Sequence, residues 1–125
     1  MIKKLTDDMI DPILQSTRTF IIIFYSENMP NLSNIMAVFE EFDEQFKGKI
    51  DVYKCEIDTE TGKLKKYFQM TALPAMVMMK NNKPYANSAG PVSAASYQNL
   101  IRSGIVKIME EQKQQKSGYS TISAL

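Results

Sequence analysis

Residues 20–25 constrain the fold most strongly, because they form an unbroken run of aromatic and β-branched side chains, Phe-Ile-Ile-Ile-Phe-Tyr. Such residues favour β-strands. The run does not alternate between apolar and polar residues, as it would on a sheet with one face in water. It is also much too short to cross a bilayer. It therefore predicts a central strand that other elements cover on both faces.

The rest of the chain predicts helices and strands that alternate around this central strand. Apolar spacings of three and four residues indicate helices, short apolar runs indicate strands, and Gly, Pro and Asn-Asn mark the turns between them. The expected elements are a short helix from Thr6 that Pro12 shortens or bends, the strand at 20–25, a helix over 31–48, a strand over 50–57, a basic helix over 59–67 capped by Asp58 or Thr59, a strand over 75–79, a turn at Asn81-Asn82, a return strand over 83–88 and a helix over 93–111. This order predicts an α/β fold, in which a mixed sheet of about four strands ends in an antiparallel hairpin and has helices on both faces.

Length and charge favour one domain and exclude several classes of partner. The 125 residues suit one domain over 1–111, followed by a polar segment over 112–125 that we expect to be a flexible tail. A net charge of +1 gives no basis for binding nucleic acid. The chain has no apolar stretch of the roughly 18 residues that a membrane span needs. Asp7, Asp8 and Asp11 interrupt any secretory signal near the start. We therefore expect a cytoplasmic protein without membrane insertion.

The reactive side chains are few. The chain has no histidine, which excludes histidine-based acid–base catalysis, and its one cysteine, Cys55, excludes an intrachain disulfide. The nine methionines fall mostly at positions that are expected to fill the core rather than in a cluster of soft metal ligands. We expect no metal and no cofactor.

Several short segments, in order, resemble the thioredoxin family from Leu5 to about Val106. The family's cis-proline segment is similar to Ala72-Leu73-Pro74-Ala75, and its Lys-Asn-Gly hairpin is similar to Lys80-Asn81-Asn82-Lys83. Further matches are Leu5-Thr6-Asp7-Asp8, Phe24-Tyr25-Ser26-Glu27, Ile57-Asp58 and the late Gly90. The resemblance implies a thioredoxin fold with a cis peptide bond before Pro74.

The departures from the family fall in its active site. The family's Trp-Cys-Gly-Pro-Cys segment aligns with Asn28, Met29, Pro30, Asn31 and Leu32, so both cysteines are replaced. The family's buried acid aligns with Ile23. Thiol–disulfide exchange requires a thiolate to attack and a second thiol to resolve the mixed disulfide. The resemblance therefore implies a domain that is inactive as a dithiol oxidoreductase and is not an enzyme of that kind.

The resemblance also implies a binding surface. In the family, backbone beside the cis-proline pairs with an extended substrate segment, and the candidate groove here consists of Met29, Ile57, Ala72, Leu73, Pro74, Ala89 and Gly90. This predicts a module that binds a protein or an extended peptide. In the alternative interpretation, Pro74 only builds the fold, Leu32 packs the start of a helix and Met29 lies in a loop.

Two other functions stay open at this point. Cys55 could act as a single redox thiol, although its place within an apolar strand favours burial. The domain could instead be a structural subunit of a larger complex, without a peptide groove. The sequence does not separate this last possibility from the binding module.

Overall fold

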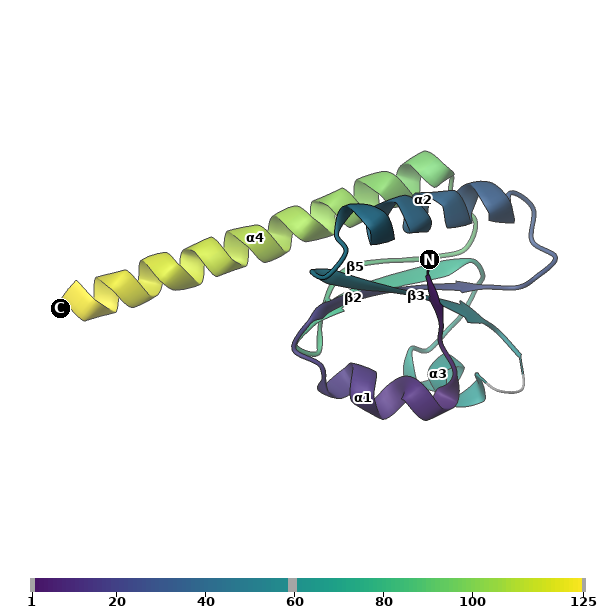
Figure 1. The fold of residues 1–125 in the computed structure, drawn as a ribbon, viewed down its shortest axis with the longest axis horizontal. Coiled ribbons are helices and arrows are strands. Elements are labelled where there is room, and N and C mark those ends of the chain that lie inside the picture. The colour runs from purple at the N-terminus through teal and green to yellow at the C-terminus, as the bar shows by residue number, and fades with distance from the viewer. Residues whose placement is uncertain (1, 59–60, 125) are drawn as a thin grey trace.

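The computed structural model describes residues 2–58 and 61–124, and their side chains as far as Gln114. Five strands form one sheet in the order β1-β3-β2-β4-β5 (Figure 1). They are β1 (Lys3–Lys4), β2 (Thr19–Tyr25), β3 (Ile50–Glu56), β4 (Ala75–Lys80) and β5 (Lys83–Ala89). The helical elements are the 3-10 helix η1 (Asp7–Met9) and the α-helices α1 (Ile10–Gln15), α2 (Leu32–Gln45), α3 (Gly62–Tyr67) and α4 (Ala94–Ala124). The predicted α/β fold with its terminal hairpin is confirmed.

Strand β2 is the centre of the sheet, as the run at 20–25 predicts. It pairs in parallel with β3 and antiparallel with β4. Its side chains alternate between two separate hydrophobic clusters, with Ile21 and Ile23 on one face and Phe20, Ile22 and Phe24 on the other. All five are at most 3% exposed. Burial on both faces explains why the run is apolar throughout.

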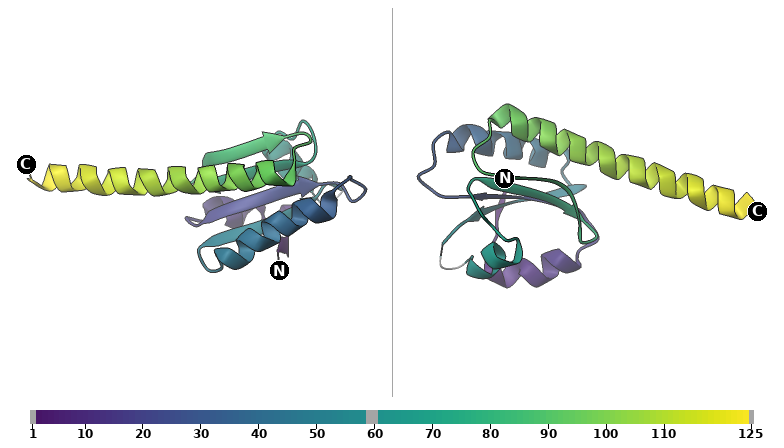
Figure 2. Two further views of the ribbon diagram at one scale, coloured as in Figure 1. Left: turned by 90° about the horizontal axis from the view of Figure 1, so that it is seen from above. Right: turned by 180° about the vertical axis from the view of Figure 1, so that it is seen from behind.

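One layer of helices covers each face of the sheet (Figure 1). On one face, α2 and α4 pack side by side, and the ring of Phe39 meets that of Tyr97 edge to face at a centroid distance of 5.4 Å. On the other face lie η1, α1 and α3, which contribute Ile13 and Leu64 to the core. The view from above in Figure 2 shows α4 continuing well past the sheet.

Strand β1 is the element that the sequence did not predict, and it raises the sheet from about four strands to five. Lys3 and Lys4 pair in parallel with Tyr53 and Lys54 of β3. Both lysines are exposed, which suits the edge of a sheet because charged side chains discourage pairing with another chain. Two charged residues show no alternation of apolar and polar side chains that would predict a strand. The strand forms because the edge of β3 offers backbone groups for pairing.

The ends of three helices differ from the predictions. The first helix is split into η1 and α1, and the hydroxyl of Thr6 bonds to Asp8 rather than capping a backbone amide. The basic helix begins at Gly62, and the candidate cap Thr59 lies outside the described residues. The last helix does not end near Glu111 but continues to Ala124, because Gln and Lys favour helix and no proline interrupts them. Whether residues 112–125 move as a flexible tail stays a prediction.

The hairpin between β4 and β5 forms as predicted. Asn81 and Asn82 have φ angles of 51° and 63°, in the left-handed region that asparagine tolerates better than most residues. Two successive residues of this kind fit the twist of the flanking strands. The Asn-Asn pair places Lys80 opposite Lys83, and a register shift between Met78 and Met79 then brings Ala75 opposite Ala89.

The start of α3 is capped from a distant part of the chain. The Asp7 carboxylate accepts hydrogen bonds from the backbone amides of Lys63 and Leu64, both at 3.0 Å. These amides are in the first turn of the helix, where they have no partner within it. Asp7 thus joins η1 to α3 on the same face of the sheet.

We expect Asp7→Ala to lower the free energy of unfolding by about 1–2 kcal/mol, the usual loss when a helix cap is removed. Urea denaturation followed by circular dichroism measures this. The neighbouring variant Asp8→Ala removes the same charge from an exposed side chain that caps no helix, and should cost less than half as much. Equal losses in the two variants would contradict the capping role.

Gly104 allows α4 to lie close to the sheet. A Cβ atom at this position would lie 2.5 Å from Sδ of Met78 and 3.3 Å from Cβ of Ala86. Met78 is fully buried, so its side chain has little room to move. Glycine has a low helical propensity, but at this position its lack of a side chain lets the helix pack close to the sheet.

We expect Gly104→Val to destabilise the protein by about 1–3 kcal/mol through overpacking. Thermal unfolding measures the loss. Gly62→Ala is the control, because a Cβ there meets nothing within 4 Å. Combining Gly104→Val with Met78→Ala should cost less than the sum of the two single changes, and simple additivity would contradict the predicted clash.

Candidate functional site

The candidate site residues gather at one end of the sheet because of its topology. Strands β2 and β3 end here, β4 begins here and β5 ends here. The loop over 26–31, Ile57, the segment over 70–74 and Gly90 therefore leave the sheet at the same edge. In Figure 1 this is the end opposite to the C-terminus.

The loop that replaces the cysteine segment closes on itself. The Met29 amide donates to the Ser26 carbonyl at 3.2 Å, and the Ser26 amide donates to the Met29 thioether at 3.2 Å. Met29 is half-buried in this turn and does not line the pocket described below. This contact favours the loop-packing interpretation of Met29 over a role in a groove.

The residues after Met29 start helix α2. Asn31 has a φ angle of 61°, and its carbonyl accepts the Ile35 amide at 3.0 Å, which is the first bond of the helix. Pro30 and Asn31 are exposed, as is Asn28, while Leu32 is half-buried. The loop offers neither a thiol nor a titratable side chain between positions 28 and 32.

Ile23 occupies the position that the family resemblance assigns to a buried acid. It is fully buried on β2, opposite Lys54 on one side and Met76 on the other, and its cluster includes Ile35 of α2. A branched alkyl side chain carries no proton that could move during catalysis. The buried residues of its cluster include no acid.

Pro74, Ala89 and Gly90 come together in the structure. The Leu73–Pro74 peptide bond is cis. The Gly90 amide donates to the Pro74 carbonyl at 2.9 Å, next to the pair formed by Ala75 and Ala89. Gly90 has a φ angle of 93°, and a Cβ atom there would lie 3.9 Å from Cβ of Ala72. Gly90 therefore lies against the segment that precedes Pro74.

A surface pocket of about 330 Å³ opens in front of this segment. It brings together three of the predicted groove residues, Ile57, Ala72 and Leu73. The structure adds three that the sequence analysis missed, Lys65, Met70 and Thr71. Met70 and Thr71 could have been found from their place beside Ala72, but only the path of α3 brings Lys65 to the pocket. Met29, Pro74, Ala89 and Gly90 are not among the pocket-lining residues.

A buried hydroxyl positions Ile57 at the pocket. Thr61 is fully buried, and its hydroxyl accepts the Asp58 amide at 2.9 Å and donates to the Glu56 carbonyl at 3.0 Å. The Ile57 amide in turn donates to the Tyr25 carbonyl at 2.9 Å, which extends the pairing of β2 and β3. These bonds fix the path of the chain as it leaves β3.

The comparison with known families agrees with this arrangement. The family model described as Thioredoxin matches residues 1–103. The chain belongs to the thioredoxin family. It is a member with one cysteine, so it cannot form the intrachain disulfide on which dithiol exchange depends.

The one cysteine of this thioredoxin-family domain is buried. Cys55 is 0% exposed, in the hydrophobic cluster between the sheet and helices α1 and α3. Burial raises the pKa of its thiol to about 12, with smaller contributions in the same direction from Asp58 and Asp7 and an opposing one from the Thr61 hydroxyl. The nucleophilic thiolate is therefore scarce at neutral pH, and reagents have no path to it.

Metal and membrane sites receive no support from the part of the chain that the structure describes. Its Cys, Asp and Glu side chains form no group of three or more that could hold a metal ion. None of its helices combines the length and the apolar character needed to cross a membrane, although α4 is 31 residues long.

We expect the native Cys55 thiol to react with a thiol reagent at pH 8 only when the protein unfolds. The measurement is the absorbance of released thionitrobenzoate, with and without urea. A Ser33→Cys variant adds an exposed thiol on α2 as the control and should give one fast equivalent. Fast reaction of native wild-type protein would contradict the burial of Cys55.

The same thiol predicts a pH dependence of stability. Its pKa is about 12 in the folded state, against an ordinary value of 9.0. The folded state therefore favours the protonated thiol, so this contribution is present below pH 9 and is lost as the pH rises towards 12. The free energy of unfolding should fall less steeply over this range in Cys55→Ala than in the wild type. Parallel profiles would contradict the raised pKa.

Proposed function

We propose that this domain binds an extended peptide segment of a partner protein at the pocket beside Leu73, and that it does so without redox chemistry. The observation that carries the proposal is the pocket formed by Ile57, Ala72 and Leu73, next to backbone that is available for pairing. Backbone amides and carbonyls of Thr71, Ala72 and Leu73 pair with no other backbone group among the described residues. Backbone groups of this kind pair with an extended ligand strand in many peptide-binding domains.

The pocket lining suits a ligand segment that combines an apolar side chain with an acidic one. Ile57, Met70 and Leu73 supply apolar surface, and methionine adapts readily to ligands of different shape. Lys65 is the one charged residue in the lining, and it is exposed. Main-chain pairing would supply most of the affinity and this lining the selectivity.

Single-thiol catalysis, the alternative function, is disfavoured by the burial of Cys55. An insulin-reduction assay with dithiothreitol tests it directly. A rate above background that disappears in Cys55→Ala would favour the alternative over the binding module.

The binding proposal is tested with a phage-displayed library of random linear peptides, selected on the wild-type protein. We expect selected peptides to lose at least about tenfold in affinity, or 1.4 kcal/mol, against Ala72→Glu. Ala72 is exposed, so a charge there leaves the fold intact. Tyr67→Glu is the control, because Tyr67 is 48% exposed but does not line the pocket.

Main-chain pairing is tested separately by methylating single backbone nitrogens of a selected peptide. Alternate positions should lose binding, because only every second residue of a strand points its amide at a given neighbour. A library without binders that depend on Ala72, or binding that is insensitive to methylation, would overturn the proposal.

A further inference from the structure

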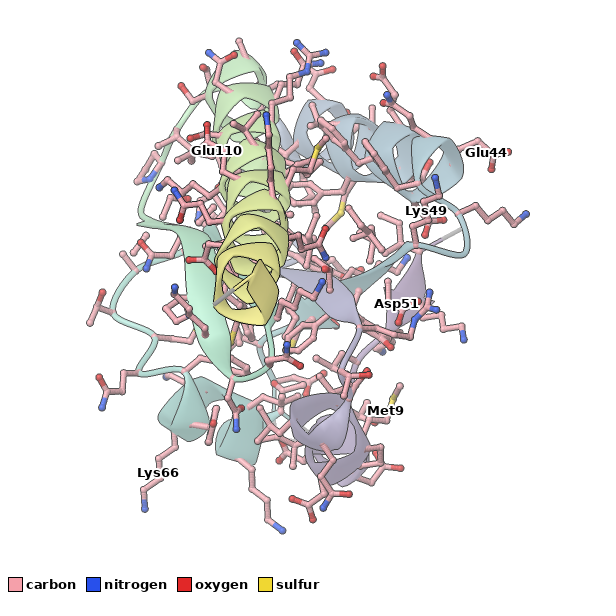
Figure 3. The ribbon with its side chains drawn as sticks, turned by 90° about the vertical axis from the view of Figure 1, so that its left-hand side faces the viewer. Met9, Glu44, Lys49, Asp51, Lys66 and Glu110 are labelled. Atoms are coloured by element: carbon pink, nitrogen blue, oxygen red, sulfur yellow. The ribbon has the colours of Figure 1, made fainter. Side chains whose placement is uncertain are left out.

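A second surface lies at the opposite end of the sheet, beside the middle of α4. There, a groove of about 460 Å³ runs between the helix and the edge where β2 and β3 begin and β4 ends. Its apolar lining comes from Phe46, Ile50, Ile105, Ile108 and Met109. Figure 3, which looks along α4, shows Lys49 to one side of the helix and Glu110 on the other.

Helix α4 extends beyond the sheet against which its first half packs. Its 31 residues span about 46 Å at 1.5 Å per residue. The carboxylate of Glu111 accepts hydrogen bonds from Lys83 and Tyr85 of β5, and this fastens the helix to the sheet and lowers the pKa of Glu111. Beyond it the helix continues away from the sheet, as both views in Figure 2 show.

Apolar side chains are exposed where α4 passes the edge of the sheet. Met109 is 62% exposed and Val106 is 51% exposed, and with Tyr67 they are the large hydrophobic side chains most open to solvent among the described residues. Met109 also lines the groove. Met109 and Val106 thus present apolar surface to solvent at the point where the helix passes the edge of the sheet.

The sequence continues the spacing of the packed part of α4 into its distal part. Starting at Ile101, steps of four and three residues lead alternately through Ile105, Ile108, Gln112, Gln115, Tyr119 and Ile122. This is the spacing with which one helix packs lengthwise against another. A polar residue at such a seam lowers stability but fixes the alignment of the two helices.

We propose that two copies of this chain associate through α4, with the distal part of each helix lying antiparallel in the groove beside the other copy's Ile105 and Met109. An antiparallel pair centred between residues 113 and 114 sets the two glutamines, 112 and 115, level with each other. It also sets positions 119 and 122 level with Ile108 and Ile105. Between residues 105 and 122, apolar seam positions are thus level with apolar ones and polar positions with polar ones.

The place of the groove selects the antiparallel direction. The α4 residues that line the groove are Ile105, Ile108, Met109 and Gln112, and all of them precede the centre of the pair. An antiparallel pair therefore lays the distal part of each helix over the groove of the other copy. A parallel pair would set each groove level with its own copy and leave both uncovered.

The first test is sedimentation equilibrium of the full chain over a range of concentrations. We expect a dimer, and at least a tenfold rise in its dissociation constant in Met109→Glu. Asn99→Glu adds the same charge to an exposed position on the sheet-packed half of α4 and should leave the dimer unchanged. Thermal unfolding checks that both variants are folded. A wild-type monomer at every concentration, or a dimer insensitive to Met109→Glu, would overturn the proposal.

The second test reads the direction of the helices by oxidative cross-linking. Gln112→Cys and Gln115→Cys are prepared separately, and buried Cys55 does not compete with either new thiol. The antiparallel pair predicts that the mixture forms a mixed disulfide dimer in preference to either homodimer. Preferential cross-linking of each variant with itself would indicate a parallel pair and overturn the proposed arrangement.

Discussion

Between Phe20 and Phe24, no side chain of β2 is more than 3% exposed, and the backbone of the strand pairs along both edges. Burying one such apolar side chain contributes about 1.5–3 kcal/mol, so these five residues together outweigh any single contact elsewhere in the fold. Both helix layers depend on them. The cluster under α2 and α4 forms around Ile21 and Ile23, and the cluster over α1 and α3 forms around Ile22 and Phe24.

The same strand explains how the family's active site has been converted. Where a dithiol enzyme of the family carries an acid, Ile23 adds to the core. At the end of the strand, the Met29 thioether closes a turn with the Ser26 amide. The site therefore has neither a proton carrier nor a nucleophile, while the Leu73–Pro74 peptide bond is cis. The peptide binding proposed for this end of the sheet would depend on the backbone there rather than on sulfur chemistry.

The two surfaces proposed here lie at opposite ends of the sheet, and the topology keeps them apart. The pocket beside Leu73 lies where β2 and β3 end, and the groove beside Met109 lies where they begin. Pairing through α4 would therefore leave the peptide pocket of each copy open. A dimer of this kind presents two pockets, which strengthens binding to partners that carry repeated segments.

Much of the fold could be predicted from the sequence because its signals are local. The apolar run at 20–25 specified a doubly covered strand, Asn81-Asn82 specified a hairpin, and spacings of three and four residues specified the helices. The strand β1 could not be predicted, since Lys3 and Lys4 carry no pattern of their own and pair only because β3 offers an edge. A hydrogen bond to the first turn of α3 comes from Asp7, which is 56 residues before Lys63, so a search near the helix could not find it.

The candidate site divides in the same way. The sequence by itself determined what chemistry is absent, because one cysteine and no histidine decide that wherever the residues lie. The resemblance to the thioredoxin family, rather than a local pattern, grouped Pro74, Ala89 and Gly90 in one candidate site. Only the tertiary structure decided that Met29 turns back on its own loop and that Lys65 reaches the pocket. It also decided that α4 extends beyond the sheet. These outcomes depend on packing between segments far apart in the sequence, and no local pattern encodes such packing.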